Sequence, residues 1–444
     1  MGTVTCIAPI NIAVLKYWGK RNETLILPTN DSISLTLDTE QLCTKTTVML
    51  SEKFKKDRIW LNGVEEDIKN PRLQICLSEI RKRAKLEEEM MNWKVHICSE
   101  NNFPTASGLA SSASGYACLT LALAQLYKVK GDVSTIARMG SGSACRSTLG
   151  GFVRWRMGLF EYGTDSVAEQ IAPASSWPEM RCLILVVNDN KKLVSSTVGM
   201  KRTYKTSELY HFRTSYIVPE RADLIDAAIV SKDFKLFAEL TMKDSNQMHA
   251  VCLDSYPPII YLNDISFAIM NLIHSYHNAT GQIQVAYTFD AGPNPTLYLL
   301  ERNVPEVIAL LDHYFPPDSN NLDNYKRGLP IETVELSQDI INNIDSKVYE
   351  PGKIKYMIYT RIGDGPKYLV SPDDHLLNDE DNTGSMDTDR TNKNTDRASK
   401  EIGRSSRNTD CARKLRLEFD RCRSWTSGFF HFDEREKKPN RTSI

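Results

Sequence analysis

The stretch PTASGLASSASG, residues 104–115, places two glycines and four serines directly before a long apolar segment. Small residues let a phosphate chain approach the backbone, and the first N–H groups of a helix, with its dipole, favour negative charge. No Gly-Lys-Ser/Thr follows the glycines, which excludes a Walker loop. A small-residue helix packed against a sheet would use the same residue types. The stretch by itself therefore leaves phosphate binding and close packing as equal alternatives.

The residues around this stretch alternate between strand and helix patterns. Asn62-Gly63 suits a type I′ turn after a strand at 58–61, and CLILVV at 182–187 is typical of a buried strand. The other predicted strands are 3–8, 32–37, 44–49, 93–99, 152–156, 284–289, 296–301 and 354–360. The predicted helices are 72–86, 109–127, 133–139, 208–212, 222–230, 234–248, 259–277 and 304–314. This mixture predicts an α+β fold.

A chain of 444 residues is too long for one ordinary domain and predicts two. We place them at 1–190, which holds the glycine- and serine-rich loop, and at 191–376. From about Asn378 onward large apolar residues become rare, so this part cannot bury enough surface to offset its ordering entropy. Residues 377–444 are therefore predicted to form a disordered tail.

Composition restricts the partners and the compartment. The formal net charge of -1 gives no general attraction to nucleic acid or to acidic membranes, so any anion must be captured locally. The ten cysteines form no CxxC pair and no cluster at zinc spacing, which favours reduced thiols. No basic leader and no apolar run of about 18 residues occurs. We expect a cytoplasmic protein without a membrane span.

A second glycine- and serine-rich cluster, GSGSACRS at 140–147, contains an arginine. The fork of the Arg146 guanidinium can bind a carboxylate or phosphate through two parallel hydrogen bonds, while the Ser141 and Ser143 hydroxyls can fix orientation. A helix cap followed by a surface arginine would give the same pattern. The cluster thus indicates an anion site or a cap, with equal weight.

Near the start, APINIAVLKYWGK at 8–20 carries two lysines and two aromatic residues around a glycine. Lys16 and Lys20, four residues apart, repel one another on a helix unless an anion lies beside them, which indicates a diphosphate. The alternative is a surface strip of lysines over a buried Trp18.

In VAYTFDAGPNPT at 285–296, a strand ends in Asp290 before a tight Gly-Pro turn. A carboxylate held there can act as a base or orient a hydroxyl. Taken alone, a simple turn cap is favoured.

Together, four segments in this order closely resemble the mevalonate diphosphate decarboxylase family in its eukaryotic form. They are APINIAVLKYWGKR, NNFPTASGLASSASGYA, GSGSACRS and AYTFDAGPN, and the resemblance covers about residues 3–376, including WLNG, STVGM and MKDSN. The wider superfamily of galactokinase, homoserine kinase, mevalonate kinase and phosphomevalonate kinase (the GHMP group) shares only the PxxxGLxSS loop. The four segments are therefore specific for the decarboxylases.

The resemblance implies a two-domain fold and a reaction. The N-terminal domain is expected to be ribosomal protein S5 domain 2-like and the C-terminal domain ferredoxin-like, usually in a homodimer. The implied reaction converts ATP and (R)-mevalonate 5-diphosphate to isopentenyl diphosphate, ADP, phosphate and CO2 with Mg²⁺, a step of isoprenoid and sterol synthesis. Ser107 and Ser114 stand where the family usually has alanine, and NPT replaces the usual NAV after the aspartate turn.

The resemblance also implies roles for individual residues. Asp290 is expected to orient or deprotonate the C3 hydroxyl, Lys16 to stabilise the transferred phosphoryl group, and Arg146 to hold the substrate carboxylate. The implied substrate-binding residues are Tyr17, Trp18, Gly19, Lys20, Arg72, Ser141, Gly142, Ser143, Ala144, Cys145, Arg146, Ser196 and Thr197. The implied ATP-binding residues are Pro104, Ser107, Gly108, Leu109, Ala110, Ser111 and Ser112, with Ser112 also at the metal.

Two other functions compete with this one. A GHMP-type kinase would phosphorylate a small molecule without decarboxylation, but Arg146 and Asp290 in their motifs argue against it. An inactive homologue that only binds a partner is suggested by the unusual tail alone. Every residue that the resemblance requires is present, which favours the enzyme over the binding protein.

Overall fold

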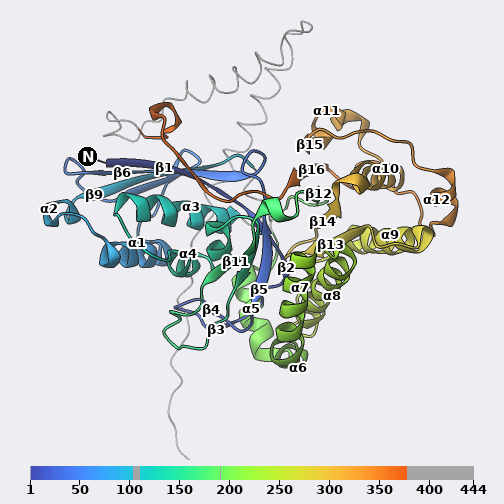
Figure 1. Ribbon diagram of the computed structural model, residues 1–444, viewed down its shortest axis with the longest axis horizontal. Coiled ribbons are helices and arrows are strands. Elements are labelled where there is room, and N and C mark those ends of the chain that lie inside the picture. The colour runs from blue at the N-terminus through green and yellow to red at the C-terminus, as the bar shows by residue number, and fades with distance from the viewer. Residues whose placement is uncertain (1, 104–110, 191, 378–444) are drawn as a thin grey trace, which may run out of the picture. The chain divides into compact units, whose positions relative to one another are not determined.

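The computed structural model describes residues 2–103, 111–190 and 192–377. Its first sheet has the strand order β17-β1-β6-β9-β7-β8 and is antiparallel except where β7 runs parallel to β9. Figure 1 labels β1, β6 and β9 of this sheet. The strands are β1 (Gly2–Pro9), β6 (Cys43–Ser51), β7 (Arg58–Leu61), β8 (Val64–Glu66), β9 (Lys94–Asn101) and β17 (Lys367–Leu369). The helices beside it are α1 (Pro71–Arg83), α2 (Glu88–Met91), α3 (Ser111–Leu126) and α4 (Ser134–Gly140).

The first sheet receives its last strand from the far end of the chain. In β17, Leu369 pairs with Thr5 and Lys367 with Ile7, so β17 forms the edge beside β1. Residues just beyond it also reach this sheet, because the Leu376 amide donates to Thr47 Oγ1 at 2.9 Å. The C-terminal end of the described chain is thereby attached to the N-terminal sheet.

A second sheet lies between the first and the C-terminal half of the chain. Its order is β11-β10-β5-β2, and a small two-stranded sheet of β3 and β4 lies nearby (Figure 1). The strands are β2 (Asn11–Leu15), β3 (Lys20–Asn22), β4 (Leu27–Pro28), β5 (Ser32–Thr36), β10 (Phe152–Trp155) and β11 (Ala168–Ala172). The 3₁₀ segment η1 (Gly142–Thr148) follows α4.

The third sheet has the order β13-β14-β12-β16-β15. Its strands are β12 (Met180–Val186), β13 (Val285–Phe289), β14 (Pro295–Leu300), β15 (Lys326–Gly328) and β16 (Tyr356–Arg361). Its helices are α5 (Ser196–Thr206), α6 (Glu208–Phe212), α7 (Val218–Ser231), α8 (Phe234–Leu253), α9 (Asp264–Thr280), α10 (Val304–Tyr314), α11 (Leu322–Tyr325) and α12 (Gln338–Asn343). A π-helical turn, Arg213–Ile217, joins α6 to α7.

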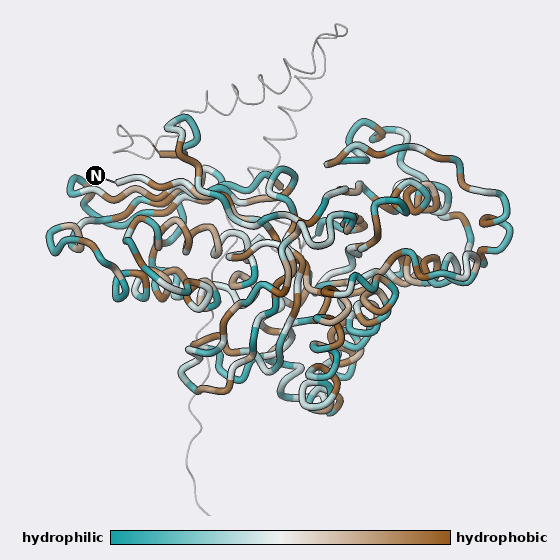
Figure 2. Tube along the Cα trace, viewed as in Figure 1, coloured by the Kyte–Doolittle hydropathy of each residue, from teal (hydrophilic) through white to brown (hydrophobic). Residues whose placement is uncertain are grey.

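One apolar core connects the second and third sheets. Ile12 and Val14 of β2 belong to the same buried cluster as Leu183 of β12 and Phe289 of β13. Tyr298 of β14 adds a hydrogen bond from its hydroxyl to the Ile12 carbonyl at 3.1 Å. Figure 2 shows hydrophobic segments along the strands and hydrophilic ones along most of the loops. The ends of β2 and β13 are therefore held side by side, which places the candidate site.

The structure confirms the α+β fold class and most of the predicted elements. The turn after β7 has positive φ at both Asn62 (48°) and Gly63 (81°), as a type I′ turn requires. The helix expected at 259–277 begins later, at Asp264, because Asn263 caps it with a reciprocal capping box. The domain boundary near 190 stays a prediction. The tail from 378 and the loop at 104–110 lie outside the described residues.

No helix within the described ranges is long and apolar enough to cross a membrane.

Candidate active site

The site is centred on an ion pair between two strand ends. Lys16 directly follows β2 and Asp290 directly follows β13, and Lys16 Nζ lies 2.6 Å from Asp290 Oδ1. The lysine side chain is 2% exposed and the aspartate side chain 40% exposed, so only the carboxylate faces outward. Burial by itself raises the pKa of Asp290, but Lys16 and, from further away, Arg146 and Lys192 outweigh it and hold the pKa below its usual value. Asp290 is thus an ionised carboxylate.

Arg146 is a buried cation whose partners are neutral. Its Nε donates to Ser34 Oγ at 2.9 Å and to Asn11 Oδ1 at 3.2 Å, and its Nη1 donates to Ser32 Oγ at 2.5 Å. Its guanidinium lies 5.7 Å from the centre of the Trp155 ring. Among the described residues no carboxylate lies within ion-pair distance of Arg146, and burial lowers its pKa. A desolvated guanidinium without a counter-ion is suited to binding an anion.

The structure therefore excludes the surface-arginine alternative for the 140–147 cluster. Arg146 is only 2% exposed, and the cluster forms the buried η1 segment rather than a cap. Gly142 lies so close to Tyr17 that a Cβ at this position would be 2.7 Å from the Tyr17 ring. Ala144 and Cys145 are fully buried, and burial raises the pKa of Cys145 to about 12. Gly142, Ala144 and Cys145 shape the site by packing.

The segment after β2 is also buried, so the lysine-strip alternative is wrong. Lys20 is 7% exposed and pairs with Glu23 at 2.9 Å, while Lys16 does not share a helix with it. Trp18 is 3% exposed and donates from Nε1 to Thr203 Oγ1 at 3.1 Å. The repulsion argument for two lysines on a helix does not apply, because β2 and β3 are strands.

Tyr17 and Gly19 complete this segment. The Tyr17 hydroxyl is buried and has no hydrogen-bond partner among the described residues, and burial raises the pKa of Tyr17. Gly19 has φ of +108°, and a Cβ at this position would lie 1.7 Å from the Tyr210 hydroxyl oxygen. Only glycine fits at this position.

Two residues from different parts of the chain meet at the other predicted substrate-binding positions. Arg72 Nη2 donates to Thr197 Oγ1 at 3.2 Å, which joins the start of α1 to the start of α5. The sequence did not single out Lys192, which donates to Ser196 Oγ at 2.9 Å and to the Ala291 carbonyl at 3.1 Å. Its only signal in the sequence was its place just before the STVGM motif.

The predicted nucleotide side is described only in part. Pro104, Ser107, Gly108, Leu109 and Ala110 lie outside the described residues. Within the described residues α3 begins at Ser111, so the last five residues of the stretch, 111–115, are helical.

Two serines of this helix face different ways. Ser112 is exposed and its Oγ lies 3.3 Å from Ser141 Oγ. Ser114, which replaces the usual alanine, is instead fully buried against Thr44 Oγ1 at 2.7 Å. Its hydroxyl therefore serves packing rather than the nucleotide.

A magnesium ion fits the residues at this end of the site. The described residues contain no group of three or more His, Cys, Asp or Glu side chains placed to hold a metal ion. Mg²⁺, however, keeps several waters and binds substrate phosphates with few protein ligands, and in phosphate-binding loops a serine or threonine hydroxyl is one of them. The exposed Ser112 hydroxyl at the start of α3 is such an oxygen.

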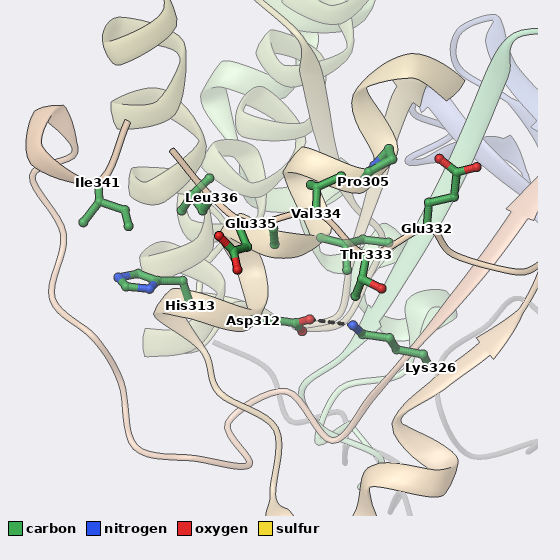
Figure 3. A pocket seen from close by; sticks show the side chains of 12 residues that line it. Pro305, Asp312, His313, Lys326, Glu332, Thr333, Val334, Glu335, Leu336 and Ile341 are labelled. Atoms are coloured by element: carbon green, nitrogen blue, oxygen red, sulfur yellow. Dashed lines mark hydrogen bonds and ion pairs between the residues drawn. The ribbon is translucent and has the colours of Figure 1, made fainter. Parts of the chain in front are cut away.

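A cavity of about 360 Å³ elsewhere in the structure shares no lining residue with this site. Figure 3 shows the Lys326–Asp312 ion pair at its wall, with side chains from α10, β15 and residues 332–336 around it. Its charged lining residues are the acids Asp312, Glu332 and Glu335 and the single lysine Lys326. The cavity therefore does not define the candidate active site.

The fold and the site define a GHMP-type enzyme, in which the buried Lys16 pairs with Asp290 and the serine-rich start of α3 contacts the segment of Arg146 through Ser112 and Ser141. Family models agree: residues 8–168 match the diphosphomevalonate decarboxylase-like N-terminal domain and residues 182–369 the mevalonate 5-diphosphate decarboxylase C-terminal domain. The chain belongs to the diphosphomevalonate decarboxylase family.

Relatives and solved structures support this assignment over most of the chain. The chain is 52% identical to the diphosphomevalonate decarboxylase of Danio rerio, with 84% of this chain and 94% of the relative covered. The identity to the Homo sapiens protein is 51%, with 85% and 96% covered. The mevalonate diphosphate decarboxylase structure from Trypanosoma brucei has a TM-score of 0.80 at 40% identity and covers 85% of this chain and 100% of its own. These similarities also confirm the two-domain organisation.

Proposed function

We propose that the chain catalyses the ATP-dependent decarboxylation of (R)-mevalonate 5-diphosphate to isopentenyl diphosphate. The observation that carries this proposal is a buried guanidinium without a counter-ion, Arg146, within electrostatic range of the ionised Asp290. A substrate that carries both a hydroxyl and a nearby carboxylate needs Asp290 for the hydroxyl and Arg146 for the carboxylate. A related structure with 31% identity and a TM-score of 0.65 was solved in complex with MVAPP, AMPPCP and magnesium, which supports the same ligands here.

Asp290 and Lys16 are the proposed catalytic pair. The Asp290 carboxylate accepts a hydrogen bond from the C3 hydroxyl and aims its oxygen at the γ-phosphorus of ATP. As the O–P bond forms and the bond to ADP breaks, the Lys16 ammonium stabilises the charge on the transferred group. Because its pKa is lowered, the Asp290 carboxylate is a weak base. Orientation is therefore its main contribution, and the hydroxyl proton passes to the Asp290 carboxylate only late in the transfer, as the O–P bond is completed.

Arg146 is proposed to hold the substrate carboxylate during elimination. When the C3–O bond breaks, phosphate leaves with the bonding electron pair and C3 becomes electron-deficient. The bond between the carboxylate and the adjacent carbon then breaks, CO2 departs, and its electron pair forms the new double bond. Arg146 fixes the carboxylate out of contact with water before this step. No further electron sink is needed.

The remaining predicted residues are proposed to hold the two phosphate-bearing ends. Lys20, Arg72 and Thr197 would bind the substrate diphosphate, with the unpartnered Tyr17 hydroxyl as an additional donor. The 104–110 loop and the start of α3 would bind ATP, with Ser112 on Mg²⁺. When bound, Mg²⁺ neutralises phosphate charge. The hydrogen bond between the Ser112 and Ser141 hydroxyls connects this end to the carboxylate site.

The rival function is a kinase that stops at the phosphorylated alcohol. A kinase of that kind has no need for a buried arginine beside the acceptor hydroxyl. The discriminating experiment incubates the purified chain with ATP, Mg²⁺ and mevalonate 5-diphosphate and measures ADP, phosphate and CO2 together. Equal yields of all three support the proposal. ADP with a stable phosphorylated product would overturn it, and a chain ending at Leu377 serves as a matched sample without the tail.

We also propose a cytoplasmic homodimer with domains at 1–190 and 191–376, acting in isoprenoid and sterol synthesis. A surface suited to a second copy lies on α6 and the following π-helical turn, where Leu209, Phe212 and Tyr216 are more than half exposed. The Phe212 and Tyr216 rings contact one another at a tilt of 33°, with 5.3 Å between the ring centres. Analytical ultracentrifugation with Phe212→Glu tests this surface, because the charge should shift the mass from dimer to monomer.

A further inference from the structure

Two consecutive residues of α8 hold the backbone on both sides of the Lys16–Asp290 pair. Asp244 Oδ2 accepts a hydrogen bond from the Lys16 amide at 2.7 Å. Ser245 Oγ accepts one from the amide of Phe289, the residue before Asp290, at 2.9 Å. One turn of α8 therefore fixes the backbone from which the side chains of Lys16 and Asp290 project.

Asp244 is a rigid anchor because its own position is fixed by two arginines. Arg213 donates to its two oxygens at 2.8 and 3.0 Å, and Arg221 donates to Oδ1 at 2.8 Å. The carboxylate is fully buried; burial raises its pKa, but the two arginines outweigh this and keep the pKa below its usual value. A charged, fully bonded carboxylate cannot drift without losing several hydrogen bonds. The Lys16 carbonyl is held as well, by Asn30 Nδ2 at 3.1 Å.

Ser245 satisfies an amide that the sheet leaves open. β13 is an edge strand paired only with β14, and the Phe289 amide turns away from that partner toward α8. Asn246 and His249 of the same helix extend the contact. Asn246 Nδ2 donates to the Tyr287 hydroxyl at 3.1 Å, and the His249 ring packs edge-on against the Phe289 ring, with 6.2 Å between the ring centres. The end of β13 is thus fixed from one side by α8.

We propose that Asp244 and Ser245 are positioning residues that set the separation between Lys16 Nζ and the Asp290 carboxylate. This inference rests on the proposed function and assigns to the DSN part of the MKDSN segment a role in catalysis rather than in folding alone. The two residues touch no substrate. They act through the backbone of the residues that do, and a small displacement of reacting groups is costly.

The test compares Ser245→Ala with Thr241→Val in the full chain. Thr241 is the matched control, because it lies one turn earlier on α8, is fully buried, and its hydroxyl has no partner among the described residues. We expect Ser245→Ala to lower kcat about 10- to 100-fold with KM for mevalonate 5-diphosphate changed less than about threefold. Thr241→Val should leave both constants close to those of the wild type.

The pH profile separates positioning from a general loss of stability. If Ser245→Ala moves Asp290 away from Lys16, the pKa of Asp290 rises and the acidic limb of kcat/KM shifts to higher pH. A merely structural role would lower the melting temperature without moving this limb. An unmoved limb with unchanged kcat in Ser245→Ala, or equal losses in Thr241→Val, would overturn the inference.

A second variant keeps the test independent of Ser245. Asp244→Asn keeps an oxygen for the Lys16 amide but removes the charge opposite Arg213, whereas Gln247→Ala disturbs the same arginine without touching Lys16. We expect the acidic limb to shift in Asp244→Asn and not in Gln247→Ala. If instead the wild-type chain releases no CO2, the proposed function fails, whatever these variants do.

Discussion

Replacing Arg146 by methionine should separate activity from stability. Methionine fills a similar volume without the charge, so the substrate carboxylate loses a buried, hydrogen-bonded cation. Loss of one partner from such a pair costs about 2–5 kcal/mol, which at about 1.4 kcal/mol per factor of ten is a fall of about 30- to 4000-fold in kcat/KM. The measurement is the rate of CO2 release at several concentrations of mevalonate 5-diphosphate.

The stability of the same variant is expected to change little. Arg146 loses three hydrogen bonds to neutral groups at Asn11, Ser32 and Ser34, but the cost of burying its unpaired charge disappears as well. The melting temperature without ligand should therefore stay within a few degrees of the wild type, while stabilisation by the substrate should be lost. Arg146→Lys retains the charge but not the forked set of donors, so its stabilisation by the substrate should lie between that of the wild type and that of Arg146→Met.

Either of two results would refute this reasoning. If Arg146→Met lowered the melting temperature strongly and activity in proportion, Arg146 would be a structural residue rather than an anion-binding one. If kcat/KM stayed within a factor of about three, the substrate carboxylate must bind elsewhere.

Three further predictions follow from the same geometry. Asp290→Asn should lower kcat by at least about a thousandfold while nucleotide binding, measured by calorimetry, is retained. Activity should persist on acidification through the ordinary titration range of an aspartate and be lost only at still lower pH, because the pKa of Asp290 is lowered, and Lys16→Met should move this acidic limb of the pH–rate profile upward. Gly19→Ala, with a clash at 1.7 Å, should lower the free energy of unfolding more than Gly131→Ala, which adds only backbone strain of about 1 kcal/mol in open space.

The order of elements was predictable from the sequence because most strands alternate or are bounded by turn residues. β2 was missed because all five of its residues are buried, so alternation is absent. The buried state of Lys16 and Lys20 was missed for a related reason. Lysines are rarely fully buried without a partner, and the partner of Lys16 is 274 residues away.

The chemical types at the site were predictable, but their arrangement was not. Motifs identified Arg146 and Asp290 as candidates, while residue chemistry alone favoured a turn cap for Asp290. The structure instead places its Oδ1 on Lys16. Asp244 and Ser245 gave no local signal as positioning residues. Two polar residues in a helical pattern usually indicate a solvent-exposed face, whereas both side chains are fully buried in the structure.

The pairing of β17 with β1 limits how this chain can be cut into separately expressed fragments. A fragment that ends near residue 190 would lack Lys367–Leu369 and expose the backbone edge of β1, which is a template for aggregation. Two separately expressed halves would have to exchange a strand to regain their sheets. Split-reporter designs can use this dependence, since reassembly would require each half to complete the other.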